Sequence, residues 1–232
     1  MWKKVFGISL LALFFVLSIS GCCRPPLLSS VSANLKIAQH TNTWCWAAST
    51  DMITDYYGHR IFQCDSSKFV HNNPADCSTG CAGYCSCWSV TNQPGCNQGG
   101  CGATIAQIQN NWTHWNFAYS YTASSLSWEK LKETISTSPY CDRSPIQTIW
   151  WWTNGGGHVV TAYAYAEAGG QKYVAYYNPW PPDCNNECKT DGNHCQAGIG
   201  GGDDAVSTYE AYVSSAAHQW GNSFYKFKYT TP

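Results

Sequence analysis

The order of hydrophobic and polar positions predicts helices in the first half of the chain. Between Asn42 and Tyr57, apolar or small residues recur at the spacing of one helix face, and Gly58 stands where that helix would end. Two shorter amphipathic helices are expected over 103–112 and 127–135, the second with Ser127 as its N-terminal cap. The first half is therefore expected to be mainly helical.

In the second half of the chain the hydrophobic period changes from that of a helix to that of a strand. Alternating β-branched and aromatic residues predict strands over 146–152, 158–166, 172–177 and 224–229, with one more helix over 208–217. Helices that come first and antiparallel strands that follow them are typical of an α+β fold, which is the fold class we predict.

Two cysteine-rich segments, 61–101 and 184–202, interrupt this pattern. Both are rich in Gly and small polar residues, so we expect loops held together by disulfides. The spacing of some of these cysteines also fits zinc, which stays as an alternative: Cys77, Cys81, Cys85 and Cys87 in the first segment, and Cys184, Cys188 and Cys195 in the second. Disulfides are favoured because the chain is expected to be exported, and no metal or other cofactor is predicted.

The N-terminus predicts export. Lys3 and Lys4 precede an apolar stretch, Val5 to Val16, that is too short to be a comfortable membrane span. A positive start followed by a short apolar core is typical of a signal peptide, which we place over residues 1–21. The mature protein would then occupy an oxidising compartment outside the cytoplasm.

The end of this segment resembles the lipobox of bacterial lipoproteins. In that motif a small residue, here Gly21, precedes a cysteine, here Cys22, that is acylated and becomes the new N-terminus. The resemblance implies a lipid on Cys22 and a protein anchored at the bacterial cell envelope. An ordinary secretory signal that leaves Cys22 and Cys23 for disulfides is the alternative. Residues 22–36 are expected to form a tether, and 37–232 a single domain.

The composition limits the possible partners. Lys plus Arg number 13 and Asp plus Glu number 14, so the chain has no basic field that would hold nucleic acid or an anionic membrane. We therefore expect no nucleic-acid partner, membrane contact through the lipid anchor only, and a monomer. The 14 Cys and 12 Trp, with only 12% charged residues, suit a compact, cross-linked, exported protein.

Cys45 is the candidate nucleophile because it lies in the first turn of the first predicted helix, which Asn42 or Thr43 can cap. A cysteine attacks carbonyl groups as the thiolate, and a helix N-terminus beside an imidazolium lowers the thiol pKa. We therefore expect a thiolate of lowered pKa at Cys45. A structural half-cystine is the alternative.

His158 and Asn178 are the candidate partners of Cys45. His158 follows three glycines and opens an apolar strand. If this strand and the next pair around a three-residue loop, Glu167 to Gly169, His158 lies directly opposite Asn178, and the amide oxygen can orient the imidazole. A slip of one residue would break this arrangement. A buried strand histidine and a turn-forming asparagine are the alternatives.

These residues stand in motifs that resemble those of the papain-like cysteine proteases, in particular their compact bacterial branch. The motifs are Gln39 six positions before the Cys45-Trp46-Ala47-Ala48-Ser49 string, then Gly157-His158-Val159-Val160, then Asn178-Pro179-Trp180. The resemblance covers roughly residues 37–232. It implies a papain-like fold, a polypeptide substrate, catalysis by Cys45, His158 and Asn178, an oxyanion contact from Gln39, and an indole at Trp180 that shields the His–Asn bond.

The chain also departs from the family pattern. The three residues before the nucleophile are Asn-Thr-Trp instead of the Cys-Gly-Ser of papain and the cathepsins, so substrate preference does not transfer. Two further functions stay open. One is a lipid-anchored, disulfide-rich binding protein on an inactive papain-like scaffold, and the other is a cell-wall amidase, since such enzymes also use Cys and His.

Overall fold

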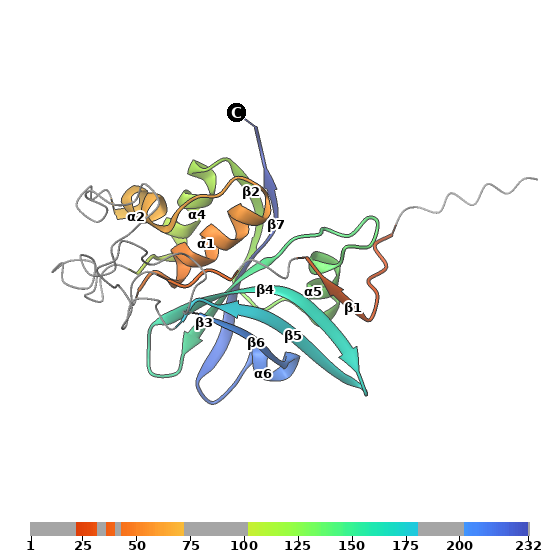
Figure 1. Ribbon diagram of the computed structural model, residues 1–232. Coiled ribbons are helices and arrows are strands. Elements are labelled where there is room, and N and C mark those ends of the chain that lie inside the picture. Colours follow the sequence, from red (N-terminus) through yellow and green to blue (C-terminus); the bar gives the residue numbers. More distant parts are fainter. Residues whose placement is uncertain (1–21, 32–35, 40–42, 72–101, 181–201, 232) are drawn as a thin grey trace, which may run out of the picture.

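A computed structural model of the chain describes residues 22–31, 36–39, 43–71, 102–180 and 202–231 (Figure 1). Its helices are α1 (Cys45–Tyr56), α2 (Gln63–His71), α4 (Ile105–His114), α5 (Trp128–Ile135) and α6 (Tyr209–Val213). Its strands are β1 (Leu28–Ser30), β2 (Phe117–Thr122), β3 (Ile146–Trp152), β4 (Gly157–Ala168), β5 (Gln171–Asn178), β6 (Asp203–Thr208) and β7 (His218–Tyr229). The α+β fold class is confirmed.

The strands form one antiparallel sheet in the order β2-β7-β3-β4-β5-β6. The seventh strand, β1, pairs with the far end of β4, where Leu28 lies opposite Ala166 and β3 no longer accompanies it. Strands β3 and β4 are the central pair, and most of their residues are buried.

Helices cover both faces of this sheet, and each face has its own hydrophobic core. On one face, helices α1 and α4 bury Trp46 and Trp112 against Ile149 of β3 and Val159 of β4. On the other face, helices α5 and α6 bury their side chains against the same strands, as Leu131 does (Figure 1). Within the described ranges, no helix is long and apolar enough to cross a membrane.

Several expected elements appear with changed ends. Helix α1 begins at Cys45, and its N-cap is Trp44 without a side-chain hydrogen bond, so the predicted cap at Thr43 is wrong; Asn42 lies outside the described residues. Gly58 ends the helix at φ +73°, as expected. The predicted Ser127 cap is confirmed, since its side chain accepts from the Lys130 N–H.

Other elements were not foreseen. Helix α2 occupies part of the segment expected to be a loop, and β2 and β6 complete the two edges of the sheet. The helix expected over 208–217 ends at Val213, because β7 already begins at His218. The remainder of both cysteine-rich segments, with the zinc alternative, lies outside the described residues.

Residues 22–31 do not form a free tether. Cys23 is bonded to Cys141, and Leu28–Ser30 is a strand of the sheet. The Ser29 hydroxyl accepts a hydrogen bond from the Thr137 N–H at 3.1 Å. Cys64 is also disulfide-bonded, and among the described cysteines Cys22 and Cys45 are free. The candidate nucleophile Cys45 therefore takes part in no disulfide.

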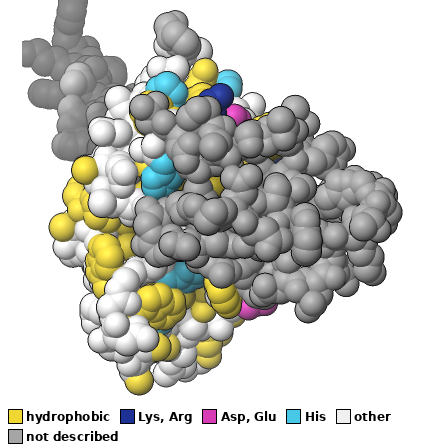
Figure 2. All heavy atoms as spheres, turned by 90° about the vertical axis from the view of Figure 1, so that its left-hand side faces the viewer, with side chains coloured by type: hydrophobic (Ala, Val, Ile, Leu, Met, Phe, Trp, Pro, Cys, Tyr) yellow, Lys and Arg dark blue, Asp and Glu magenta, His cyan; other side chains and the backbone are white. Residues whose placement is uncertain are grey.

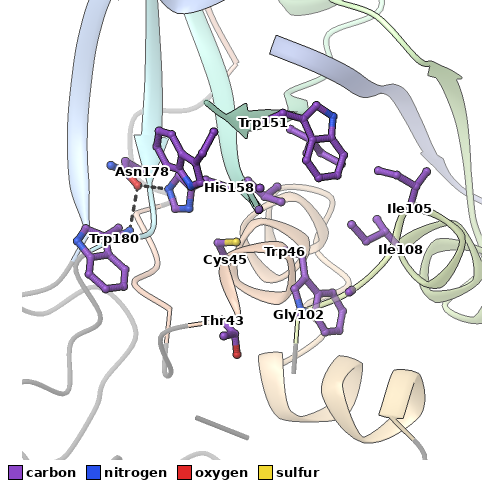
Figure 3. Close-up of a pocket in the computed structure, with 16 residues that line it drawn as sticks. Thr43, Cys45, Trp46, Gly102, Ile105, Ile108, Trp151, His158, Asn178 and Trp180 are labelled. Atoms are coloured by element: carbon purple, nitrogen blue, oxygen red, sulfur yellow. Dashed lines mark hydrogen bonds between the residues drawn. The ribbon is translucent and has the colours of Figure 1, made fainter. Parts of the chain in front are cut away.

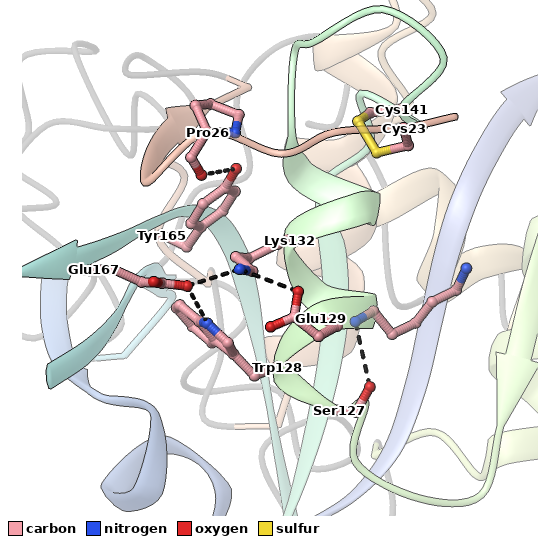
Figure 4. A network of polar contacts seen from close by, with 10 residues as sticks. Cys23, Pro26, Ser127, Trp128, Glu129, Lys132, Cys141, Tyr165 and Glu167 are labelled. Atoms are coloured by element: carbon pink, nitrogen blue, oxygen red, sulfur yellow. Dashed lines mark hydrogen bonds and ion pairs between the residues drawn. A yellow bond between two sulfur atoms is a disulfide. The ribbon is translucent and has the colours of Figure 1, made fainter. Parts of the chain in front are cut away.

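A polar network fixes α5 to the end of β4 beside this N-terminal segment (Figure 4). Lys132 lies 2.7 Å from Glu167 and 3.1 Å from Glu129, and the Trp128 indole N–H also donates to Glu167. The Tyr165 hydroxyl donates to the Pro26 carbonyl at 3.0 Å. These contacts hold the N-terminal segment at the end of β4 that is remote from Gly157, where β4 begins.

We expect Gln147→Leu to lower the free energy of unfolding by about 1 to 3 kcal/mol, because the buried Gln147 amide links two helices to β3. It accepts from the Trp112 indole N–H at 3.0 Å and donates to the Trp46 carbonyl at 3.3 Å. Chemical denaturation would measure the change. The matched Gln171→Leu variant, at an exposed position of β5, should stay within about 0.5 kcal/mol of wild type. Equal stabilities of the two variants would contradict this role.

Candidate active site

The N-terminal half of α1 is held against β4 by buried polar contacts. The hydroxyl oxygens of Ser49 and Thr161 lie 2.6 Å apart, both fully buried, across 112 residues of sequence. The Gln147 amide of β3 holds the Trp46 carbonyl, in the first turn of the helix. As a result the first helical residue, Cys45, lies at the end of the sheet where β4 begins (Figures 1 and 3).

The side chains of His158 and Asn178 meet in a direct hydrogen bond. His158 Nε2 lies 2.7 Å from Asn178 Oδ1, and the Trp180 backbone N–H donates to the same oxygen at 3.1 Å (Figure 3). The Trp180 N–H donor identifies the shared atom as the amide oxygen, which can only accept, so Nε2 is a donor and carries the proton. The unprotonated Nδ1 is then the nitrogen left to accept a proton from a nearby thiol.

The contact forms, but the register predicted for the hairpin is wrong. The turn is the two-residue pair Gly169 and Gly170, both at positive φ, instead of a three-residue loop. With that turn alone, Asn178 would lie opposite Thr161 and point to the face away from His158. An extra residue in β4 prevents this.

Tyr163 is that extra residue. The pairs shift between Ala162 and Ala164, which makes Tyr163 a β-bulge, and Thr161 then pairs with Tyr177. Continuing that pairing places Asn178 opposite Val160, two residues from His158 and therefore on its face. The two side chains are diagonal neighbours, a separation that side chains of this length can bridge.

Gln39 is completely buried and is held beside the same segment. Its backbone N–H donates to the Pro179 carbonyl at 3.0 Å, one residue after Asn178. The Gln63 amide donates to the carbonyl of Ala38 at 2.8 Å and so anchors this stretch from α2. The structure thus brings Gln39 to the neighbourhood of the pair, but Gln39 is not among the residues that line the cavity described next.

A cavity of about 610 Å³ joins these groups. Among the described residues that line it are Cys45, His158, Asn178 and Trp180, and none is Asp, Glu, Lys or Arg. Trp180 lines the cavity beside Asn178 and is 43% exposed, and the shielding expected of its indole stays a prediction (Figure 3). On the same side of the molecule, the described side chains that are visible in Figure 2 are largely uncharged.

Burial opposes ionisation of both reacting groups. It raises the pKa of Cys45 to about 11, although hydrogen bonds from the backbone of Val159, Trp46 and Cys45 lower it. Burial also lowers the pKa of His158, against the raising effect of the bond to Asn178. The lowered thiol pKa expected from the helix start is therefore not found, because burial favours the neutral forms of both groups.

Trp152 is a contact of His158 that sequence reasoning missed. Its indole stacks on the imidazole with ring centroids 5.6 Å apart and an interplanar angle of 18°. It also contacts His218 edge to face at 5.9 Å, and His218 lies directly opposite it on β7. The period-two spacing of Trp150 and Trp152 was the available signal, since it puts both rings on one face of β3.

The reactive groups that the structure brings together in this cavity are the Cys45 thiol and the His158 imidazole. Within the described ranges, no group of three or more His, Cys, Asp or Glu side chains is placed to hold a metal ion. No protein-family model and no curated protein matches the chain. The site is therefore interpreted from its own geometry.

We expect Cys45 to react with iodoacetamide about a hundredfold more slowly at pH 7 than N-acetylcysteine does, because a raised pKa leaves less thiolate. Raising the pH should increase the thiolate fraction, so the rate should still be climbing between pH 9 and pH 11. Mass spectrometry of digested protein, with the disulfides intact, would follow the adduct on Cys45. A rate that is already constant below pH 7 would show a thiolate–imidazolium pair in the free protein.

Proposed function

We propose that this protein is a cysteine peptidase of the papain-like type, which cleaves peptide or isopeptide bonds through an acyl-enzyme. The observation that carries the proposal is the hydrogen bond between His158 Nε2 and Asn178 Oδ1, beside Cys45 at the start of a helix, in one cavity. A nucleophile, a base and a group that orients the base are the parts that this chemistry needs.

In the proposed reaction His158 acts as a general base. Nδ1 takes the proton of the Cys45 thiol as the sulfur attacks the substrate carbonyl, so the thiolate develops during attack. The imidazolium then gives its proton to the leaving amine, and water activated by the same histidine releases the acyl group. Asn178 holds the ring in the tautomer that these transfers require.

The developing oxyanion needs hydrogen-bond donors that point into the cavity. The backbone N–H of Cys45, in the first turn of α1, is one proposed donor, and the side-chain amide of Gln39 is the other. The bond from Gln39 N–H to the Pro179 carbonyl supports this assignment because it ties Gln39 to the segment that carries Asn178. Loss of one such donor typically costs a factor of about 10² to 10³ in rate.

We also propose that the enzyme is a lipoprotein of the bacterial cell envelope, with the lipid on Cys22. Cys22 is exposed and free, whereas its neighbour Cys23 is bonded to Cys141. A free, exposed thiol at the position of the lipobox cysteine is what acylation requires. Residues 1–21 would be the signal peptide removed in that process.

The raised pKa of Cys45 favours a second candidate, a lipid-anchored binding protein whose cavity accepts a peptide without cleaving it. A buried neutral thiol is a poor nucleophile unless His158 removes its proton in the transition state. Turnover by the wild-type protein distinguishes the two candidates.

We expect Cys45→Ala and His158→Ala each to abolish peptide hydrolysis without loss of the fold. Asn178→Ala should lower kcat by up to about 10²-fold and change KM much less, because a misaligned imidazole affects the transition state more than substrate binding. Steady-state kinetics on a mixed peptide substrate would measure this. The control Asn110→Ala, at an exposed position of α4, should match wild type. Full activity in Cys45→Ala would exclude the proposed nucleophile.

For the anchor we expect membrane-extracted protein to begin at Cys22 and to carry an acylated N-terminal peptide. Cys22→Ser should abolish the acylated peptide and release or mislocalise the protein, because the substitution removes the acylation site proposed. Mass spectrometry and fractionation would measure both results. A soluble wild-type form that begins at another residue would contradict the assignment.

A further inference from the structure

The disulfide between Cys23 and Cys141 fixes the proposed lipid attachment point to the folded domain. Cys22 directly precedes Cys23, and the Cα atoms of the two bonded cysteines are 4.7 Å apart (Figure 4). The Cα atom of Cys22 therefore lies within about 9 Å of that of Cys141. A free chain over 22–36 would instead let the domain stand up to roughly 50 Å from its anchor. Acyl chains on Cys22 would thus hold the surface around Cys141 at the level of the lipid headgroups.

Large apolar side chains are exposed on both segments that this disulfide joins. Leu27 and Leu28 follow the first cysteine by four and five residues and are 65% and 68% exposed. Tyr140 directly precedes the second cysteine and is 74% exposed. Among the described residues, only one other large hydrophobic side chain exceeds 60% exposure, Val206 of β6. Leu27, Leu28 and Tyr140 are called the anchor face below, because all three lie beside the attachment point.

The backbone keeps the anchor face in place. Leu28 belongs to β1, which pairs with β4, and the Leu27 carbonyl accepts a hydrogen bond from the Glu167 N–H at 2.7 Å. Tyr140 has φ +64°, a left-handed conformation that is costly for a bulky residue. Its exposed ring is therefore not the product of a relaxed turn. A ring with a polar hydroxyl is typical of the boundary between water and lipid.

The charges around the anchor face suit phosphate groups. Arg24 and Arg143, each within two residues of a bonded cysteine, are exposed, and neither forms an ion pair with a described residue. The acidic side chains of the neighbouring elements are each paired with a lysine: Asp142 with Lys226, Glu133 with Lys130, and Glu129 and Glu167 with Lys132. Two guanidinium groups are therefore left to bond lipid phosphates, which their geometry fits.

The anchor face lies at the end of β4 that is remote from the candidate site. Leu28 pairs with Ala166, eight residues along β4 from His158, which corresponds to roughly 25 Å of strand (Figure 1). A domain held by its β1 side would therefore keep the Cys45 cavity away from the lipid, on the part of the molecule that polypeptides in the aqueous phase can reach.

We propose that the anchor face docks on the phospholipid bilayer that holds the Cys22 lipid, with Arg24 and Arg143 at the lipid phosphates. The inference rests on the proposed lipid anchor and not on the proposed peptidase activity. It adds a direct contact of the domain to the contact through the anchor alone that the sequence predicts. The bilayer is the occupant because the Cys23–Cys141 bond puts the lipid and the anchor face side by side.

Hydroxyl-radical footprinting of the acylated protein tests the docking. Wild-type protein is inserted through its own lipid into vesicles of phosphatidylethanolamine and phosphatidylglycerol that contain no other protein. Cys22→Ser protein is mixed with the same vesicles, and mass spectrometry measures the oxidation of each side chain. We expect the anchor face to be oxidised about fivefold more slowly in the inserted protein, because lipid covers it, and Val206 to be oxidised equally in both.

A partition measurement gives the strength of the contact. A single tetradecyl chain attached through a maleimide to the free, exposed Cys22 of the mature protein would by itself bind membranes only marginally and reversibly. We expect Leu28→Thr combined with Tyr140→Asn to weaken the partition of this protein into the same vesicles about tenfold, because less apolar surface enters the lipid. Both replacements suit the local backbone. The control Val206→Thr should partition like wild type in vesicle sedimentation.

The outcomes separate the inference from the proposals beside it. Acylated protein whose anchor face is oxidised as fast as in Cys22→Ser, or equal partition of the double variant and wild type, would overturn the docking while the lipid anchor and the peptidase stand. Protection found in cell membranes but not in protein-free vesicles would assign the surface to a protein partner and overturn it too. Absence of a lipid from Cys22 in the natural protein would overturn the anchor and the docking together, and would leave the peptidase proposal standing.

Discussion

The candidate site depends on the packing of the first turns of α1 against β4. Two buried hydrogen bonds set the position of the helix start. One joins the hydroxyls of Ser49 and Thr161, and in the other the Gln147 side-chain amide donates to the Trp46 carbonyl. Cys45 lies on α1 and His158 lies on β4. If α1 were shifted along β4, Cys45 would therefore move away from His158. These contacts link residues about a hundred positions apart, so the site exists only once helix and sheet have docked.

Two β-bulges adapt the regular sheet to the cavity. Tyr163 corrects the side-chain alternation of β4 so that Asn178 and His158 share a face. Gly221 in β7 leaves room for the ring of Trp151, which lines the cavity. Each bulge interrupts the ladder and leaves one residue unpaired. The Tyr163 bulge lies in β4, which lines the cavity, and the Gly221 bulge lies in β7, the other neighbour of β3.

Burial of this site fixes the orientation of His158 but disfavours the charged forms of Cys45 and His158. The uncharged walls and the stacked Trp152 ring keep His158 in place, yet the same surroundings disfavour both the thiolate and the imidazolium. In the mechanism that we propose, the charges form together with the bond to the substrate. The backbone N–H groups that point to the sulfur, from Val159 and Trp46, lessen the cost of that step.

The sequence by itself determined the α+β class, the main strands, the place of Cys45 in the first turn of a helix, and the residue types of the site, because these follow from local periodicity and from the chemistry of single side chains. Only the tertiary structure decided the rest. The hairpin register depends on the two-glycine turn, which the pair Gly169-Gly170 does signal, and on a bulge at Tyr163 that the pattern does not show. The pKa of Cys45 depends on how deeply the docked helix is buried, and the space for the Trp151 ring depends on glycines of two other strands. Such properties arise from distant parts of the chain, so a local pattern cannot contain them.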